Sequence, residues 1–87
     1  YFMSKKKIDL NPSIDVDGIL EAMEAKYAHE QISTIDGVKI DFEMEWVHLR
    51  KSNTEPIIRI YTEAPSQEKA DILADKIIQE IKNIARI

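Results

Sequence analysis

The sequence predicts an α+β fold, in which two helices pack on one face of an antiparallel sheet in the order β-α-β-β-β-β-α. Two segments, at about 15–28 and 67–84, carry apolar residues at helical spacing. The remaining segments favour strands, at about 1–10, 31–35, 38–45, 46–50 and 57–64. Asp36-Gly37 is a strong signal for a two-residue hairpin, which joins antiparallel strands.

The first strand and the first helix are separated by a break at residues 11–13. Pro12 ends regular structure, and Ser13 or Asp15 can cap the helix that follows. The apolar positions of this helix are Ile19, Leu20, Met23 and Tyr27. Residues 1–10 read as an edge strand, whose lysines suit an exposed edge because charge there discourages aggregation; they are Lys5, Lys6 and Lys7.

The strand after the hairpin alternates between two faces. Its apolar positions are Val38, Ile40, Phe42 and Met44, and its polar positions are Lys39, Asp41, Glu43 and Glu45. Residues 46–50 continue as strand, with Val47 and Leu49 inward and with Trp46, His48 and Arg50 outward. In the strand at 57–64, Ile58 and Ile60 fit the core, and the outward positions are Arg59, Tyr61 and Glu63.

The last helix opens at Pro65-Ser66, with Ser66 as its expected N-cap. Its apolar stripe consists of Ala70, Leu73, Ala74, Ile77, Ile81 and Ile84.

Composition narrows the class of function. A length of 87 residues favours one domain of modest stability. The net charge of −4 argues against nonspecific nucleic-acid binding, and no apolar run is long enough to span a membrane. The chain has no cysteine, so a disulfide scaffold is excluded while the redox compartment is left open. Nothing in the sequence asks for secretion, and a cytoplasmic location is expected. The first residue is Tyr1 rather than Met, which hints at a fragment.

The connection at residues 50–56 is dense in hydrogen-bond donors. The guanidinium of Arg50 matches phosphate oxygens bidentately, Ser52 and Thr54 offer hydroxyls, and Asn53 offers an amide. A tight turn here would also aim successive backbone N–H groups at one anion. Pro56 would hold the loop in shape. The residues alone leave two interpretations open: a phosphate site, or an ordinary polar hairpin loop.

Arg50-Lys51-Ser52-Asn53-Thr54-Glu55-Pro56, with the strand that follows to Ala64, resembles the phosphate-binding loop and following strand of the α-D-phosphohexomutases. Asp36-Gly37-Val38-Lys39-Ile40 and Trp46 resemble the strands that precede this loop. The resemblance implies the C-terminal domain, of TATA-binding-protein-like fold, of a larger multidomain mutase. It implies an enzyme of the phosphoglucosamine or phosphomannomutase type that interconverts hexose 1-phosphate and 6-phosphate.

The resemblance also implies residue roles. Arg50, Ser52, Asn53 and Thr54 should contact the substrate phosphate, with Arg59 as a second arginine, while Lys51 stands at a variable position where only its backbone is implied. Catalytic residues and the Mg²⁺ site should lie in other domains of the same chain. This domain should therefore need no cofactor or metal of its own and should be inactive alone. Its partners should be the phosphosugar and those domains.

Other interpretations stay open. His48 could lie near the phosphate, although a lone strand histidine is more often structural, and the carboxylates at 41, 43 and 45 favour a solvated face over a metal site. A protein-interaction module that uses the outer sheet face is the alternative function. Convergence of Arg50 and Arg59 on one concave spot with the loop hydroxyls would favour phosphate; splayed side chains would favour the interface.

Overall fold

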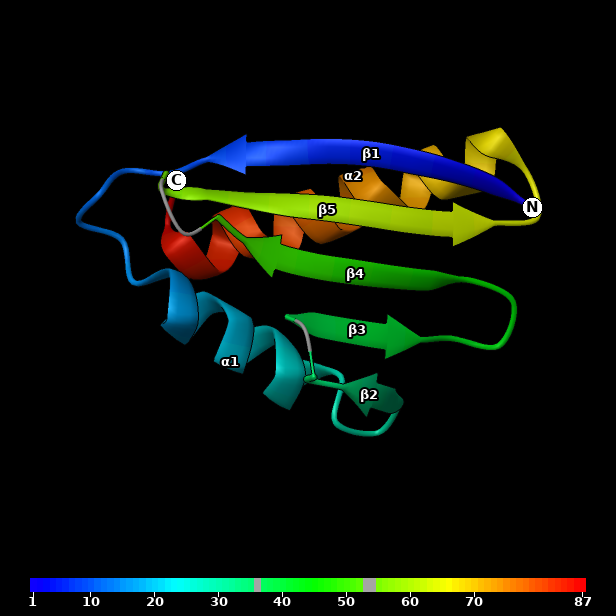
Figure 1. Cartoon of the computed structure of the whole chain (residues 1–87), viewed down its shortest axis with the longest axis horizontal. Helices are drawn as coiled ribbons and strands as arrows, with labels where there is room; N and C mark the ends of the chain where they lie inside the picture. Colours follow the sequence, from blue (N-terminus) through cyan, green and yellow to red (C-terminus); the bar gives the residue numbers. More distant parts are fainter. Residues whose placement is uncertain (36, 53–54) are drawn as a thin grey trace.

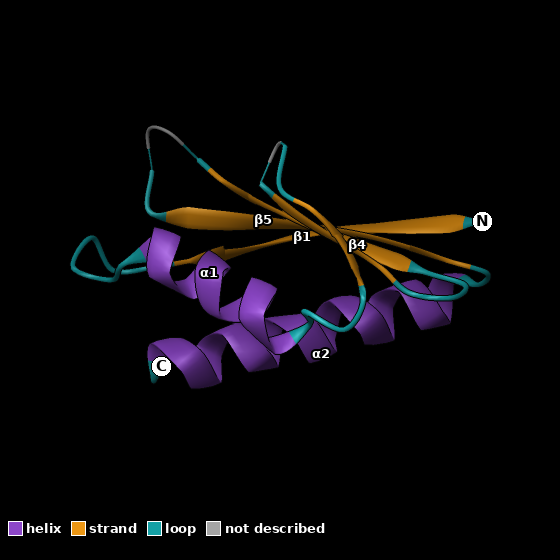
Figure 2. Cartoon of the chain, turned by 90° about the horizontal axis from the view of Figure 1, so that it is seen from below, coloured by secondary structure: helices purple, strands orange, loops and turns teal. Residues whose placement is uncertain are grey.

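The computed structural model describes residues 1–35, 37–52 and 55–87. The elements are β1 (Phe2–Asp9), α1 (Val16–Lys26), β2 (Gln31–Ser33), β3 (Val38–Asp41), β4 (Trp46–Lys51), β5 (Ile57–Ala64) and α2 (Gln67–Ala85). The predicted fold class and element order are confirmed. Both helices lie on the same side of the sheet, and the other side is open (Figures 1 and 2).

The five strands form one antiparallel sheet in the order β1-β5-β4-β3-β2. The N-terminal strand β1 pairs along its whole length with β5, from Phe2 opposite Ala64 to Asp9 opposite Ile57. β5 therefore lies between β1 and β4, and residues far apart in the sequence become neighbours across three strands. This pairing determines which side chains share the open face.

The prediction for the strand after Gly37 is wrong in one respect. β3 ends at Asp41, and the backbone N–H of Phe42 donates to the carbonyl of Glu45 at 2.8 Å, which closes a turn. Met44, predicted on the buried face, is 56% exposed. The even-numbered residues of β3 point inward, but in β4 the odd-numbered residues point inward. A continuous strand cannot switch its inward side in this way, so the chain must turn between β3 and β4. β2 is also shorter than predicted and ends at Ser33, with Ile35 96% exposed.

The helix starts follow the predicted capping chemistry. Asp15 rather than Ser13 caps α1, because its carboxylate accepts from the Gly18 N–H at 3.0 Å while Ser13 bonds to Asn11. Ser66 caps α2 by accepting from the Lys69 N–H at 3.1 Å. No helix in the described ranges is long and apolar enough to cross a membrane.

The hydrophobic core lies between the sheet and the helices. The largest fully buried side chains come from α1, β3, β4, β5 and α2; they are Met23, Ile40, Val47, Leu49, Ile58, Ile60, Ile77 and Ile81. Thr62 is also buried, and its hydroxyl is satisfied by donating to the carbonyl of Ala70 at 2.8 Å. The apolar stripe of α2 thus packs as predicted, except that Ile84 near its end is 37% exposed.

A hydrogen bond between the two helices accompanies this core. The Tyr27 hydroxyl donates to Glu80 at 2.6 Å, and Lys26 lies 3.4 Å from the same carboxylate. Burial, together with the hydrogen bond to Glu80, raises the pKa of Tyr27 above its ordinary value of 10.0. The folded state therefore holds the tyrosine proton more tightly than the unfolded chain.

Tyr27→Phe is expected to lower the free energy of unfolding by about 1 kcal/mol at neutral pH, because the hydrogen bond to Glu80 is lost. The raised pKa makes wild-type stability fall as pH rises above about 10, where the unfolded chain releases the proton and the folded chain does not. Urea denaturation of both proteins between about pH 8 and 11 measures this difference. A Tyr27→Phe protein that loses stability as steeply as wild type above pH 10 would contradict the assignment.

Candidate functional site

The two arginines singled out in the sequence lie side by side. Arg50 on β4 and Arg59 on β5 are direct cross-strand partners, and both are exposed. Partners in an antiparallel pair point to the same side of the sheet, about 5 Å apart at Cβ. Because their neighbours Leu49 and Ile60 are buried beneath the helices, both arginines occupy the open face.

The connection that follows Arg50 begins and ends beside this pair. The Ser52 N–H donates to the carbonyl of Ile57 at 3.2 Å, and the Ile57 N–H donates to that of Glu55 at 2.8 Å. The Leu10 N–H donates to the carbonyl of Pro56 at 2.6 Å, which ties the connection to the chain leaving β1. The described ends of the connection rise on the side away from the helices (Figure 2). Asn53 and Thr54, two predicted phosphate ligands, lie outside the described residues.

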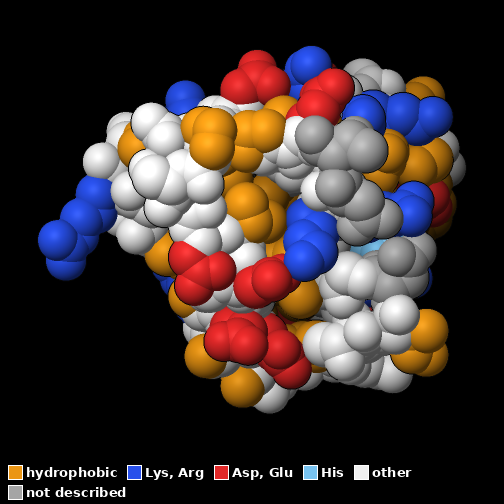
Figure 3. Space-filling model, turned by 60° about the vertical axis from the view of Figure 1, so that its left-hand side comes forward, with side chains coloured by type: hydrophobic (Ala, Val, Ile, Leu, Met, Phe, Trp, Pro, Cys, Tyr) orange, Lys and Arg blue, Asp and Glu red, His pale blue; other side chains and the backbone are white. Residues whose placement is uncertain are grey.

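Charged side chains of both signs lie on this end of the molecule (Figure 3). Lys and Arg side chains lie beside the residues drawn in grey, the largest group of Asp and Glu side chains lies below and to the left, and further Asp and Glu side chains lie above. The net charge of −4 therefore does not prevent cationic side chains from being available to an anion here.

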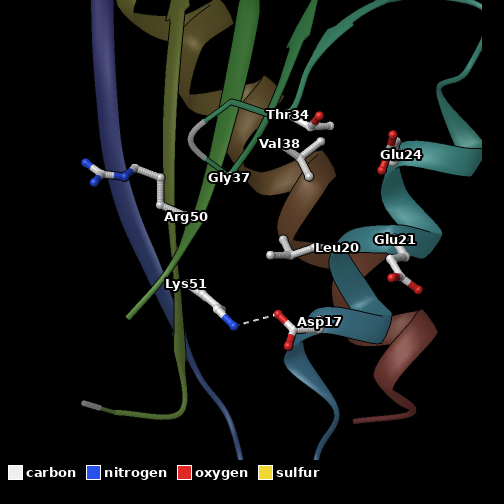
Figure 4. A pocket seen from close by; sticks show the side chains of 9 residues that line it. All are labelled: Asp17, Leu20, Glu21, Glu24, Thr34, Gly37, Val38, Arg50 and Lys51. Atoms are coloured by element: carbon white, nitrogen blue, oxygen red, sulfur yellow. Dashed lines mark hydrogen bonds and ion pairs between the residues drawn. The ribbon is translucent and has the colours of Figure 1, made fainter. Parts of the chain in front are cut away.

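Lys51 turns away from the arginines. Its ammonium donates to the Asp17 carboxylate of α1 at 2.7 Å, while Arg50 points in the opposite direction (Figure 4). Adjacent residues of a strand point to opposite faces, so Lys51 falls on the helix side of the sheet. Asp17 lies in the first turn of α1, and its pairing with Lys51 depends on how α1 packs, so no local sequence signal predicts it.

A pocket of about 490 Å³ opens between α1 and the strands on this helix side. Its acidic lining comes from α1 and consists of Asp17, Glu21 and Glu24 (Figure 4). Arg50 and Lys51 also belong to the lining, but Lys51 is paired with Asp17 and the Arg50 side chain points away from α1 (Figure 4). The carboxylates would repel a phosphate group, so the pocket is a poor candidate for the predicted ligand. The arginine pair on the open face is the better candidate for the predicted phosphate site.

Gly37 holds β4 in place just before Arg50. Its φ of +73° lies in the left-handed region, and a Cβ atom there would come within 2.2 Å of the carbonyl oxygen of Leu49. Only glycine fits such a close approach of two backbones. The hairpin signal in the sequence thus has a direct structural link to the position of Arg50.

The other residues that the sequence raised as possible ligands, His48 and the carboxylate at position 41, contact neighbouring side chains of the sheet. The His48 ring lies 6.4 Å from the ring of its cross-strand partner Tyr61. Lys39 lies 4.9 Å from the centre of the Trp46 ring and 3.7 Å from Asp41. Within residues 1–35, 37–52 and 55–87, no three Asp, Glu, His or Cys side chains are grouped to hold a metal ion.

The fold and the arginine pair define a class of small α+β domain, in which a helix-covered antiparallel sheet presents basic side chains on its open face. Residues 5–80 match the family described as phosphoglucomutase/phosphomannomutase, C-terminal domain, and the chain belongs to that family. This agrees with the resemblance seen in the loop motif.

Proteins with similar sequences are named as mutases of the same family. The chain is 40% identical over 97% of its length to a phosphoglucosamine/phosphogalactosamine mutase of Sulfurisphaera tokodaii. It is 44% identical over 79% of its length to a phosphoglucomutase/phosphomannomutase of Thermococcus kodakarensis, and 32% identical over 99% to a probable phosphoglucosamine mutase of Pyrococcus horikoshii. The chain spans only 15–20% of the length of these three relatives.

Proposed function

We propose that residues 1–87 form the substrate-phosphate-binding domain of a larger cytoplasmic phosphohexomutase, which interconverts hexose 1-phosphate and 6-phosphate. The observation that carries this proposal is the pairing of Arg50 with Arg59 on the open face, beside the connection with the family's motif. The names of the relatives favour a phosphoglucosamine or phosphomannomutase.

The proposed role is anchoring. The guanidinium of Arg50 would take two phosphate oxygens through parallel N–H donors, and Arg59 would add a second charge. Ser52, Asn53, Thr54 and the backbone at Lys51 would complete the cradle. Binding energy at this remote phosphate orients the hydroxyl that reacts elsewhere on the sugar.

The chemical step is proposed to belong to other domains of the same chain. We propose that Mg²⁺, which the family implies, is held by another domain; within residues 1–35, 37–52 and 55–87 no three Asp, Glu, His or Cys side chains are grouped to hold a metal ion. No step is assigned through Mg²⁺ here, and the domain alone is proposed to be inactive.

An NMR titration of the ¹⁵N-labelled domain with glucosamine 6-phosphate tests the proposal. Saturable shifts are expected at the amides of Ser52, Asn53 and Thr54, with a dissociation constant on the order of millimolar, since only the phosphate end of the ligand is held. Glucosamine without phosphate should produce no such shifts. Arg50→Ala should abolish them, while Lys76→Ala, which removes the same charge on α2, should not.

Absence of phosphate-dependent binding would favour the alternative function, a protein-interaction module. If the ligand produces no phosphate-dependent shifts at about 50 mM, a concentration that saturates even a weak site, anchoring by this domain is contradicted. The open face would then be better explained as a protein-interaction surface.

A further inference from the structure

We infer that Lys7 of the N-terminal strand is a third cationic contact for the substrate phosphate, next to Arg59 and Arg50. The inference rests on the proposed function and extends the site beyond its loop motif. In the sequence, Lys7 reads only as part of an exposed strand edge.

The strand register places the three cations in one row. Lys7 is the cross-strand partner of Arg59, and Arg59 is the partner of Arg50. All three residues are exposed, and their side chains share the open face because direct partners point to the same side. Arg59 occupies the centre of the row, with one cation on each side.

Such a row is unfavourable in the absence of an anion. Like charges directly opposite each other destabilise a sheet. Compensation is slight for two of the three cations: Lys7 lies 4.0 Å from Asp9, and within the described ranges the Arg59 guanidinium makes no ion pair or hydrogen bond. Arg50 does have an interaction within the protein, so the repulsion that matters here is the one between Lys7 and Arg59. A bound dianion would remove the repulsion, so the row has the electrostatics of a phosphate site.

The surface beside the row has room for a ligand. A depression of about 350 Å³ lies over β1 and β5, and its lining includes Lys5, Lys7, Arg59 and Tyr61. Because Lys7 and Arg50 are both cross-strand neighbours of Arg59, their long side chains can reach an anion held above it.

The neighbouring lysines of β1 are placed less favourably. Lys6 points to the helix side, where its ammonium donates to Asp75 of α2 at 2.6 Å, and this hydrogen bond raises the pKa of Lys6. Lys5 shares the open face but lies one row farther from the β4–β5 connection, opposite Tyr61. Lys7 is therefore the lysine of β1 best placed to contact the phosphate.

The affinity of four proteins for glucosamine 6-phosphate, measured by NMR titration, tests the role of Lys7. Lys7→Gln is expected to weaken binding about three- to tenfold relative to wild type, as expected for one charge near a solvated phosphate. Lys7→Arg should bind within about twofold of wild type, because the charge is kept. Lys76→Gln on α2 should also stay within about twofold, since it removes the same charge on the other face.

A second measurement separates binding from folding. Lys7→Gln should unfold in urea at the same or a slightly higher concentration than wild type, because a repulsion is removed. Lost affinity with unchanged stability supports a direct contact, and the Lys7 side-chain CεH₂ signals should shift on titration of the wild type.

The outcomes distinguish the two proposals. If wild type binds the phosphosugar and Lys7→Gln binds equally well, the role of Lys7 is overturned and the proposed function stands. If wild type shows no phosphate-dependent binding, both are overturned. If Lys7→Arg is as weak as Lys7→Gln, the effect is not one of charge, and the contact is overturned.

Discussion

Gly37→Ala is expected to lower the free energy of unfolding by roughly 2–4 kcal/mol, through a strained φ and a backbone clash. The added Cβ would meet the carbonyl oxygen of Leu49 at 2.2 Å and its carbonyl carbon at 3.2 Å. Neither atom belongs to a flexible side chain, so β3 and β4 would have to separate. Since Arg50 follows Leu49 directly, phosphate affinity should fall with stability. Urea denaturation and the glucosamine 6-phosphate titration measure the two effects.

Gly18→Ala provides the matched control. There the added Cβ would meet the Asp15 carboxylate at 2.6 Å, and this flexible side chain can move. Alanine also favours the helix by about 1 kcal/mol relative to glycine, which offsets a weakened cap. The change in stability should therefore stay within about 1 kcal/mol in either direction. Equal losses at both glycines would show that close packing at Gly37 has no special role.

If the domain anchors the substrate phosphate as proposed, Arg50→Ala should lower kcat/KM of the full-length protein by about 10²- to 10³-fold, because a bidentate charge-assisted contact of roughly 3–4 kcal/mol would be lost. The proposed contact would hold the phosphate both in the ground state and in the transition state, so most of the loss should appear in KM. Steady-state kinetics with the hexose phosphate measures the change.

Two further variants show whether the loss of kcat/KM comes from the charge of Arg50 or from its planar guanidinium. Arg50→Lys keeps the charge but loses the planar fork, so its kcat/KM should lie between those of wild type and Arg50→Ala. Lys76→Ala should remain within about twofold of wild type, because its charge lies on α2. A full-length Arg50→Ala enzyme with wild-type kinetics would contradict the anchoring role, whatever the isolated domain binds.

Local patterns in the sequence were sufficient to predict the fold class. The spacing of Leu73, Ile77 and Ile81 predicts α2 because a helix repeats every 3.6 residues, and the alternation in residues 57–64 predicts β5 because a strand repeats every two. Alternation in residues 46–50 and 57–64 likewise places Arg50 and Arg59 on the outward face. Each of these signals is carried by residues within a few positions of one another.

The sequence by itself thus determined the class of fold, the outward face of both arginines and, through the loop motif, the family. Only the tertiary structure placed Lys7 beside Arg59, paired Lys51 with Asp17 and ended β3 at Asp41. The first two depend on the register of β1 with β5 and on the packing of α1. Periodicity reports which face a side chain occupies, but not which distant strand or helix lies next to it, because that choice is made by packing of the whole chain.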